Sequence, residues 1–548
     1  MTSRPGRNFR VAGFGVDSVW MNMSYSVRAL HGPAPTANQA RSEVRDNAVL
    51  FPIAVTRGFR AFSPIHLFGV GLFRLLLRAA RIGFGAGTLA RFADALVDLG
   101  LRCLCRGHAN QLGPAHEKGK LMSAGTQARG AAIRILGEVL RKRRPLDTVE
   151  TDVLASSGLD PRDAGFARAI AAETLRRFGQ IDALIRGFVP KAPPPHKSGP
   201  TLEILMAGAC ELLFLDVAPH AAVDAANRLA AADNKAVHFK ALINAVLRRV
   251  SREGKDVTAA QDAEKLNTPD WLWQGWEAAY GEDIARAIAS GHLQQPPTDF
   301  VVKGGASAPQ GATQLFGNVW RMRETGRIDL LEGFSEGAWW VQDFAASLPA
   351  RLLGDVRGQR VIDLCAAPGG KTMQLAGMDA AVTAVEREPV RMARLRENLA
   401  RAKLDAELIE ADMRDVKIAP APFVLLDAPC SATGTIRRHP ELPWIKAASD
   451  VQMTAQGAGE LLDVAADMVA PGGTLIFAVC SLEPEEGTEQ VADFLARHGG
   501  FRRKPISADE VFGLRELIDA SGDLRTLPCH LAEQGGMDGF FAARLIRV

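Results

Sequence analysis

The chain has 548 residues, of which 47% are hydrophobic and 23% charged, as is usual for a globular protein of three or four domains. Its formal net charge of +3 does not indicate a nucleic-acid partner, so any basic binding surface must be local. The seven cysteines lack the paired spacing of secreted disulfide scaffolds, which favours a reducing, cytoplasmic setting.

Residues 1–122 form an atypical, Arg-rich extension. Residues 1–120 hold 16 basic and 6 acidic side chains, whereas the rest of the chain holds 49 basic and 56 acidic ones. The composition partly resembles an organellar transit peptide. The alternative, which we favour, is that Met122 is the natural start, so that the extension is not native.

The extension contains neither a membrane-spanning segment nor a complete set of metal ligands. Its longest charge-free apolar stretch, Ala61–Phe73, has 13 residues, whereas a membrane-spanning helix needs about 20. We therefore expect no membrane partner and no secretory signal. Cys103 and Cys105 lie near His108, but no further ligand is in reach, so no metal site is expected.

Residues 124–252 are predicted to be all-helical. Apolar side chains recur at helical spacing at Ala132, Ile133, Ile135, Leu136, Val139 and Leu140. The same period from Phe166 to Ile181 predicts a second long helix. Three basic clusters lie on this small bundle, at 141–144, 176–177 and 248–252. Each is either a solvated face or a contact for RNA phosphates.

Residues 253–350 are predicted to be a mixed connector. Trp271, Trp273 and Trp276 alternate with polar residues, and helices are expected at about 280–292 and 344–353. Trp339 and Trp340 either stack on RNA bases or, as we favour, pack under the following domain.

Residues 351–548 alternate strands and helices, which predicts a parallel sheet covered on both faces. Strands are expected at 360–364, 381–385, 406–410, 423–426 and 474–479, and residues 538–548 read as an antiparallel edge strand.

The ends of the first three predicted strands describe a pocket for an adenosine-bearing ligand. A loop of small residues lets a ligand approach the backbone closely; it consists of Cys365, Ala366, Ala367, Pro368, Gly369, Gly370 and Lys371. The loop fits neither the dinucleotide nor the triphosphate fingerprint. Glu386 suits the hydroxyls of a ribose, and Asp412 suits an adenine amino group. S-adenosylmethionine therefore fits better than NAD.

Two further strand ends carry thiols and an acid. Cys430 follows Asp427-Ala-Pro, and Cys480 follows a buried strand. Carbon 5 of cytosine attacks a methyl group only after a soft nucleophile has added to carbon 6, and a thiolate suits that step. Asp427 would share a proton with ring nitrogen 3. The alternative is that both cysteines are small buried hydrophobes.

At these residues the chain resembles the RsmB (Sun/Fmu) type of RNA 5-methylcytosine methyltransferase. The matching segments are 363–372, 427–434, 437–440, 471–473, 480–486 and 535–541. The resemblance implies a Rossmann-like, class I α/β methyltransferase domain over 351–548. It implies that Cys480 is the nucleophile and that Cys430 aids product release. It also implies S-adenosylmethionine contacts by 365–371, Glu386, Asp412 and Asp427.

Residues 124–252 resemble the NusB-type RNA-binding domain fused to this enzyme in bacteria, which implies small-subunit (16S) ribosomal RNA as substrate and a multidomain monomer. Two departures from the family are a Val-Val-Lys sequence at 301–303, where relatives carry Arg-Val-Asn, and Val479, where Thr is common. Two alternatives stay open: methylation of another RNA such as tRNA, and a non-catalytic RNA-binding factor for ribosome assembly.

Overall fold

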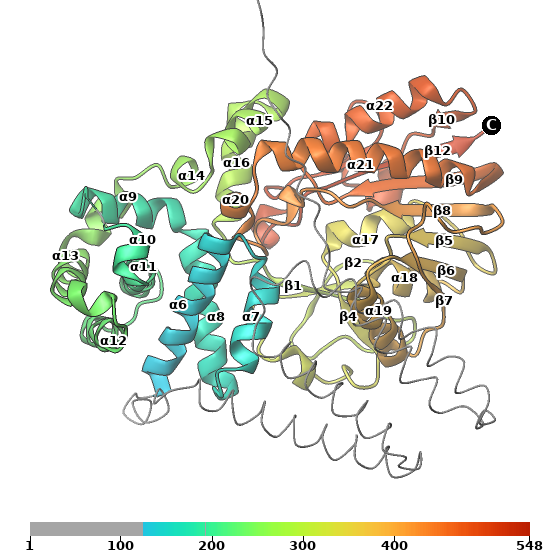
Figure 1. The fold of residues 1–548 in the computed structure, drawn as a ribbon. Helices are drawn as coiled ribbons and strands as arrows, with labels where there is room; N and C mark the ends of the chain where they lie inside the picture. The colour runs from blue at the N-terminus through green and yellow to red at the C-terminus, as the bar shows by residue number, and fades with distance from the viewer. Residues whose placement is uncertain (1–123, 192) are drawn as a thin grey trace, which may run out of the picture. The chain divides into compact units, whose positions relative to one another are not determined.

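The structure is a computed structural model that describes residues 124–191 and 193–548. The expectations for residues 1–122, including a start at Met122 and no metal at Cys103 and Cys105, lie outside the described residues. From Ala124 onward the chain forms a bundle of helices, then a small antiparallel sheet, then a large mixed sheet (Figure 1). No helix in the described ranges is long and apolar enough to cross a membrane.

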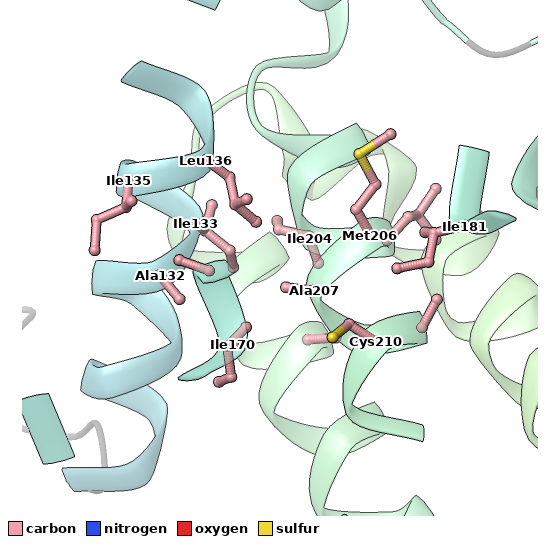
Figure 2. Close-up of a cluster of buried hydrophobic side chains, with 14 of the residues drawn as sticks. Ala132, Ile133, Ile135, Leu136, Ile170, Ile181, Ile204, Met206, Ala207 and Cys210 are labelled. Carbon is pink, nitrogen blue, oxygen red and sulfur yellow. The ribbon is translucent and has the colours of Figure 1, made fainter. Parts of the chain in front are cut away.

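The helical region buries the apolar stripe predicted from the sequence. Ile135, Leu136 and Val139 of the first helix are fully buried. Ala132 and Ile133 of the same helix belong to one core cluster with Ile170 and Ile204 of other helices (Figure 2). The helices of this region are α6 (Ala124–Lys142), α7 (Leu146–Ala155), α8 (Pro161–Arg176), α9 (Phe178–Phe188), α10 (Pro195–Ser198), α11 (Thr201–Leu213), α12 (Pro219–Ala232) and α13 (Lys240–Ala259).

One prediction for this region needs correction. The single helix expected from Phe166 to Ile181 is two helices, because Arg177 leaves helical backbone angles (φ −105°, ψ 16°) between α8 and α9. Helix α13 continues beyond its apolar part to Ala259. Its polar continuation contains no proline that would stop it.

The connector consists of three helices and a four-stranded antiparallel sheet. Its elements are α14 (Ala263–Leu266), α15 (Asp270–Tyr280), α16 (Glu282–His292), β1 (Thr298–Val302), β2 (Thr313–Phe316), β3 (Val319–Met322) and β4 (Trp339–Val341), with strand order β2-β3-β1-β4. Trp271, Trp273 and Trp276 lie on helix α15 despite their alternation. Trp339 and Trp340 are buried in apolar clusters, which confirms packing over base stacking for this pair.

The large sheet has eight strands in the order β10-β12-β9-β8-β5-β6-β7, with β11 paired to β12. The five strands from β9 to β7 are parallel. The strands are β5 (Arg360–Leu364), β6 (Ala381–Glu386), β7 (Glu407–Glu410), β8 (Ala421–Asp427), β9 (Val469–Val479), β10 (Phe501–Arg503), β11 (Leu524–Thr526) and β12 (Phe540–Arg547).

Both faces of this sheet are covered, as the sequence predicts. Alternate strand residues enter two separate cores: Val361 and Leu425 pack towards one face, Ile362 and Leu426 towards the other. The first face is covered by α17 (Phe344–Arg351), α18 (Gly370–Ala376) and α19 (Pro389–Ala402), and the second by α21 (Ala448–Asp467) and α22 (Thr488–Arg497) (Figure 1).

The carboxyl-terminal strand is antiparallel as predicted, but it is not an edge. Strand β12 lies between β9 on one side and β10 and β11 on the other, and Phe540–Leu545 are buried. The edge strand on this side of the sheet is β10, which has 3 residues. So short a segment carries too little hydrophobic pattern to be recognised as a strand from the sequence.

Candidate active site

The carboxyl ends of three predicted strands lie next to one another in the sheet. Strand β8 lies between β5 and β9, with Leu364 opposite Leu426 and Asp427 opposite Ala478. Because all three strands are parallel, the residues that follow them emerge side by side. Three loops therefore lie side by side at the carboxyl ends of these strands: the loop from Cys365, the loop carrying Cys430 and the loop starting at Cys480.

The two thiols are in contact. Cys430 Sγ and Cys480 Sγ lie 3.5 Å apart, and both residues are half-buried. The pKa of the Cys430 thiol is raised well above its usual value, first by the hydrogen bond with Cys480 and then by burial. The geometry allows either sulfur to donate in this contact, and the raised pKa of Cys430 favours Cys430 as the donor.

A set of buried polar contacts fixes the two thiol-bearing loops to each other. Ser431 Oγ lies 3.3 Å from Ser481 Oγ, and Thr433 Oγ1 lies 3.2 Å from the same oxygen. The backbone N–H of Leu482 donates to Thr433 Oγ1, and that of Gly434 donates to the carbonyl of Cys480. The separation of the sulfurs is thus set by a cross-linked pair of loops.

Gly434 brings the carboxyl-terminal segment against the same loops. Its carbonyl accepts a hydrogen bond from Gly539 N at 2.7 Å. A Cβ at position 434 would lie 2.0 Å from the carbonyl oxygen of Gly539. Only glycine permits this approach, so the segment before β12 forms part of the support for the thiol pair.

Asp427 is paired with Lys371. The ammonium Nζ of Lys371 lies 2.7 Å from Asp427 Oδ2, and it also lies 5.0 Å from the centre of the Phe540 ring. The sequence prediction assigned Lys371 to the cofactor loop and asked for a proton held at Asp427. The structure brings the two together as an ion pair at the strand end.

The predicted cofactor loop is folded tightly between β5 and α18. Cys365 has a φ of 58° and Gly369 a φ of 105°, and a Cβ on Gly369 would lie 2.5 Å from Leu395 Cδ1. Glu386 is 3% exposed and accepts hydrogen bonds from the backbone N–H groups of Ala367 and Glu388. A carboxylate has about four acceptor positions, so Glu386 retains capacity for ribose hydroxyls. These residues fit an adenosine-bearing cofactor.

Arg391 also belongs to this pocket, and the sequence analysis missed it. Its guanidinium donates to the carbonyl of Ala367 at 2.5 Å and lies 3.7 Å from Glu386 Oε2. It therefore joins the loop to the acid that follows β6. The available signal was a basic side chain in the first turn of the helix after Glu386.

Asp412 is engaged by a neighbour rather than directed freely into the pocket. Arg414 donates to both of its carboxylate oxygens, at 2.9 and 2.6 Å, and these hydrogen bonds lower the pKa of Asp412 to about 2. The contact with an adenine amino group stays a prediction. If it forms, the carboxylate accepts that hydrogen bond in addition to those from Arg414.

Asp363 is a second residue that the sequence analysis missed. It is fully buried, and its Oδ2 accepts a hydrogen bond of 2.6 Å from Thr372, while Oδ1 has no partner. Burial raises the pKa of Asp363 to about 7. An acid inside an apolar strand was the available signal, and its contact with Thr372 ties β5 to α18.

Most basic side chains of two of the three clusters of the bundle make internal contacts. Arg141 pairs with Glu203, and Arg144 pairs with Glu138 and Asp152. Arg176 is buried and donates to the carbonyl of Arg437. These three side chains therefore have a structural role, which is neither of the two roles expected from the sequence, a solvated face or an RNA contact.

Two exposed basic side chains of these clusters make no ion pair within the described part of the chain, Arg143 after α6 and Arg248 on α13. Lys303, at the position where relatives carry a different residue, donates to the carbonyls of Ala402 and Lys403 at the end of α19. It therefore joins the connector to the large sheet.

Two family models match the chain. The model of 16S rRNA methyltransferase RsmB/F matches residues 350–546, and the NusB family model matches residues 126–252. Ribosomal RNA small subunit methyltransferase B of Pseudomonas putida is 36% identical over 443 residues, which are 76% of this chain and 98% of that protein. The protein of the same name from Cronobacter sakazakii is 31% identical over 448 residues, which are 78% and 100% of the two chains.

The fold also has a counterpart among solved structures. The crystal structure of PH0851 aligns with a TM-score of 0.62 at 23% identity and covers 77% of this chain and 98% of that one. This likeness concerns the fold alone, whereas the sequence relatives are matched over nearly their whole length. The chain therefore belongs to the RsmB/F family and is an RNA methyltransferase that uses S-adenosylmethionine as its methyl donor.

Proposed function

We propose that this chain methylates carbon 5 of a cytosine in small-subunit (16S) ribosomal RNA, through a covalent bond between Cys480 and carbon 6 of the base. The observation that carries the proposal is the contact of 3.5 Å between Cys430 Sγ and Cys480 Sγ at the shared edge of the sheet. Methylation of an exocyclic nitrogen or a hydroxyl has no use for two adjacent thiols. The relatives named ribosomal RNA small subunit methyltransferase B supply the class of RNA.

The first step uses the unequal thiols. The Cys480 thiolate adds to carbon 6, a carbon–sulfur bond forms, and the ring becomes an enamine whose carbon 5 is nucleophilic. Bound S-adenosylmethionine presents an electrophilic methyl group to that carbon. Cys480 is favoured over Cys430 as the nucleophile, because a hydrogen bond from the Cys430 thiol stabilises negative charge on Cys480.

Addition places negative charge on the ring, and the Asp427–Lys371 pair meets it. A proton from the Lys371 ammonium, which lies 2.7 Å from Asp427 Oδ2, passes through Asp427 to ring nitrogen 3 and leaves the ring neutral. After methyl transfer that proton returns from nitrogen 3 to the Asp427–Lys371 pair. A water molecule takes the proton from carbon 5, the ring double bond reforms and the carbon–sulfur bond breaks. The hydrogen bond from Cys430 then stabilises the departing Cys480 thiolate.

The cofactor is held by the small-residue loop and the acids beside it. The loop 365–371 lets the methionine part approach the backbone, Glu386 receives ribose hydroxyls, and Asp412 receives the adenine amino group. Asp427 ends β8, which lies between β5 and β9 in the sheet. We further propose that the helical region of residues 124–252 binds RNA, and that the chain acts as a cytoplasmic monomer.

The test compares three cysteine variants. With labelled S-adenosylmethionine and ribosomal RNA from a deletion strain, Cys480→Ala should lose methyl incorporation on the order of 1,000-fold or more, with cofactor affinity unchanged. Cys430→Ala should accumulate a covalent protein–RNA adduct on a denaturing gel. Cys529→Ala, a half-buried cysteine elsewhere, should behave as the parent chain.

Full activity of Cys480→Ala would refute the role of that thiol. Bisulfite sequencing of 16S ribosomal RNA from the deletion strain should show one cytosine that has lost its methyl group. Loss in a transfer RNA instead would favour the alternative substrate, and no loss in any RNA would favour a non-catalytic assembly factor.

A further inference from the structure

Glu486 is a fully buried carboxylate that the proposed chemistry has not yet used. It accepts hydrogen bonds from Ser431 N at 2.7 Å, from Ser431 Oγ at 2.5 Å and from Thr454 Oγ1. Among the described residues, no Lys, Arg or His nitrogen lies within ion-pair distance of it. Its charge is therefore stabilised by hydrogen bonds alone, and two of the three come from the residue that follows Cys430.

The chain direction explains how Glu486 reaches the other loop. Residues Pro484–Glu486 form one 3₁₀ turn after Cys480, with Pro484 in its first position. The turn reverses the chain, so that the side chain of Glu486 points back to Ser431 in the neighbouring loop. The segment that carries one thiol therefore also holds the loop that carries the other.

A carboxylate does something here that an amide does not. It is an acceptor only, so both the backbone N–H and the hydroxyl of Ser431 must donate to it. This fixes the direction of the peptide next to Cys430. Its negative charge also contributes to the raised pKa of the Cys430 thiol, after the hydrogen bond with Cys480 and burial.

We propose that Glu486 is a positioning residue for the release step, acting through Ser431 to hold Cys430 in contact with Cys480. The inference rests on the covalent mechanism proposed above. Glu486 is fully buried and makes its hydrogen bonds to Ser431 and Thr454. Its loss should leave formation of the carbon–sulfur bond largely intact and should slow the breaking of that bond.

The experiment measures adduct and turnover in the full-length chain. Glu486→Gln should lower methyl turnover about tenfold, as expected for the loss of a hydrogen bond to a charged group, and should raise the fraction of protein trapped on ribosomal RNA. Glu485→Gln is the matched control, since Glu485 lies on the same turn and is exposed. It should change neither quantity.

A double variant separates positioning from a general structural role. In a Cys430→Ala background, Glu486→Gln should add no further adduct, because the residue through which it acts is gone. A lower melting temperature alone would leave the adduct fraction unchanged. If Glu486→Gln proves too unstable, Ser431→Ala removes one of the same hydrogen bonds and should also raise the adduct fraction.

The inference is overturned if Glu486→Gln matches Glu485→Gln, if it lowers turnover without adduct, or if Ser431→Ala gives none. Absence of adduct in Cys430→Ala itself would instead overturn the covalent release mechanism. The two failures are therefore distinguishable on the same gel.

Discussion

The two ends of the candidate active site are built in opposite ways. At the thiol end, Ser431, Thr433 and Glu486 are buried and make hydrogen bonds across two loops. At the cofactor end, the partners of the acids Glu386 and Asp412 are Arg391 and Arg414, whose side chains are about half exposed. Exposed ion pairs contribute about 0–1 kcal/mol, whereas a buried polar group left without a partner costs about 1–3 kcal/mol. Buried hydrogen bonds across two loops suit the thiol end, where the distance between the sulfurs must be fixed. Half-exposed ion pairs are sufficient at the cofactor end, where a ligand must enter and leave.

The largest effect should come from Gly434→Ala at the thiol end. A Cβ there would lie 2.0 Å from a backbone oxygen that cannot rotate away, so the loop and the segment at Gly539 must separate. We expect a loss of stability of about 1–3 kcal/mol and a loss of methyl transfer of about 100-fold. Thermal unfolding and incorporation of labelled methyl groups measure the two effects.

Gly457→Ala is the control for this change. Gly457 lies in α21, and a Cβ there would meet nothing within 4 Å. Alanine should leave activity unchanged and raise stability by up to about 1 kcal/mol. Equal activity of the two alanine variants would contradict the rigid support inferred for the thiols.

A smaller effect is expected from Glu386→Gln in the cofactor pocket. The amide keeps the shape of the side chain but loses a charged acceptor for ribose hydroxyls, so the dissociation constant for S-adenosylmethionine should rise about tenfold. Calorimetric titration measures this. Glu388→Gln, two residues later and exposed, should bind the cofactor as the parent chain does, and equal affinities of all three proteins would remove Glu386 from the pocket.

The sequence predicted those parts of the fold whose signal is local. The strand at Arg360–Leu364 was expected with its observed bounds, and the thiols and acids were expected at strand ends. The pairing of Asp427 with Lys371 joins residues 56 positions apart, and the contact of Glu486 with Ser431 spans 55. Neither pair has a spacing that periodicity detects.

The errors have the same origin. Arg176 reads as a surface cation until the carbonyl of Arg437 is brought to it by the fold. Strand β12 was predicted to be an edge strand because it comes last in the chain, but it pairs with β9 on one side and with β10 and β11 on the other. Position in sequence and composition say which residues are able to form a contact, whereas tertiary packing decides which contacts form.

The smallest effect on methyl transfer is expected at Glu483, in the loop after Cys480, where the change is a pH dependence of stability. Burial raises the pKa of Glu483 to about 7, with the charges of Glu485 and Glu486 adding to it, although Trp276 donates to its carboxylate. The folded state then binds a proton that the unfolded state releases near pH 4.5. Stability should therefore fall as pH rises from about 5 to above 7, by about 1–3 kcal/mol. Glu483→Gln removes this loss, so its gain in melting temperature over the parent should be a few degrees larger at pH 8.5 than at pH 5.5. An equal gain in melting temperature at both pH values would mean that ionisation of the buried Glu483 does not destabilise the thiol end.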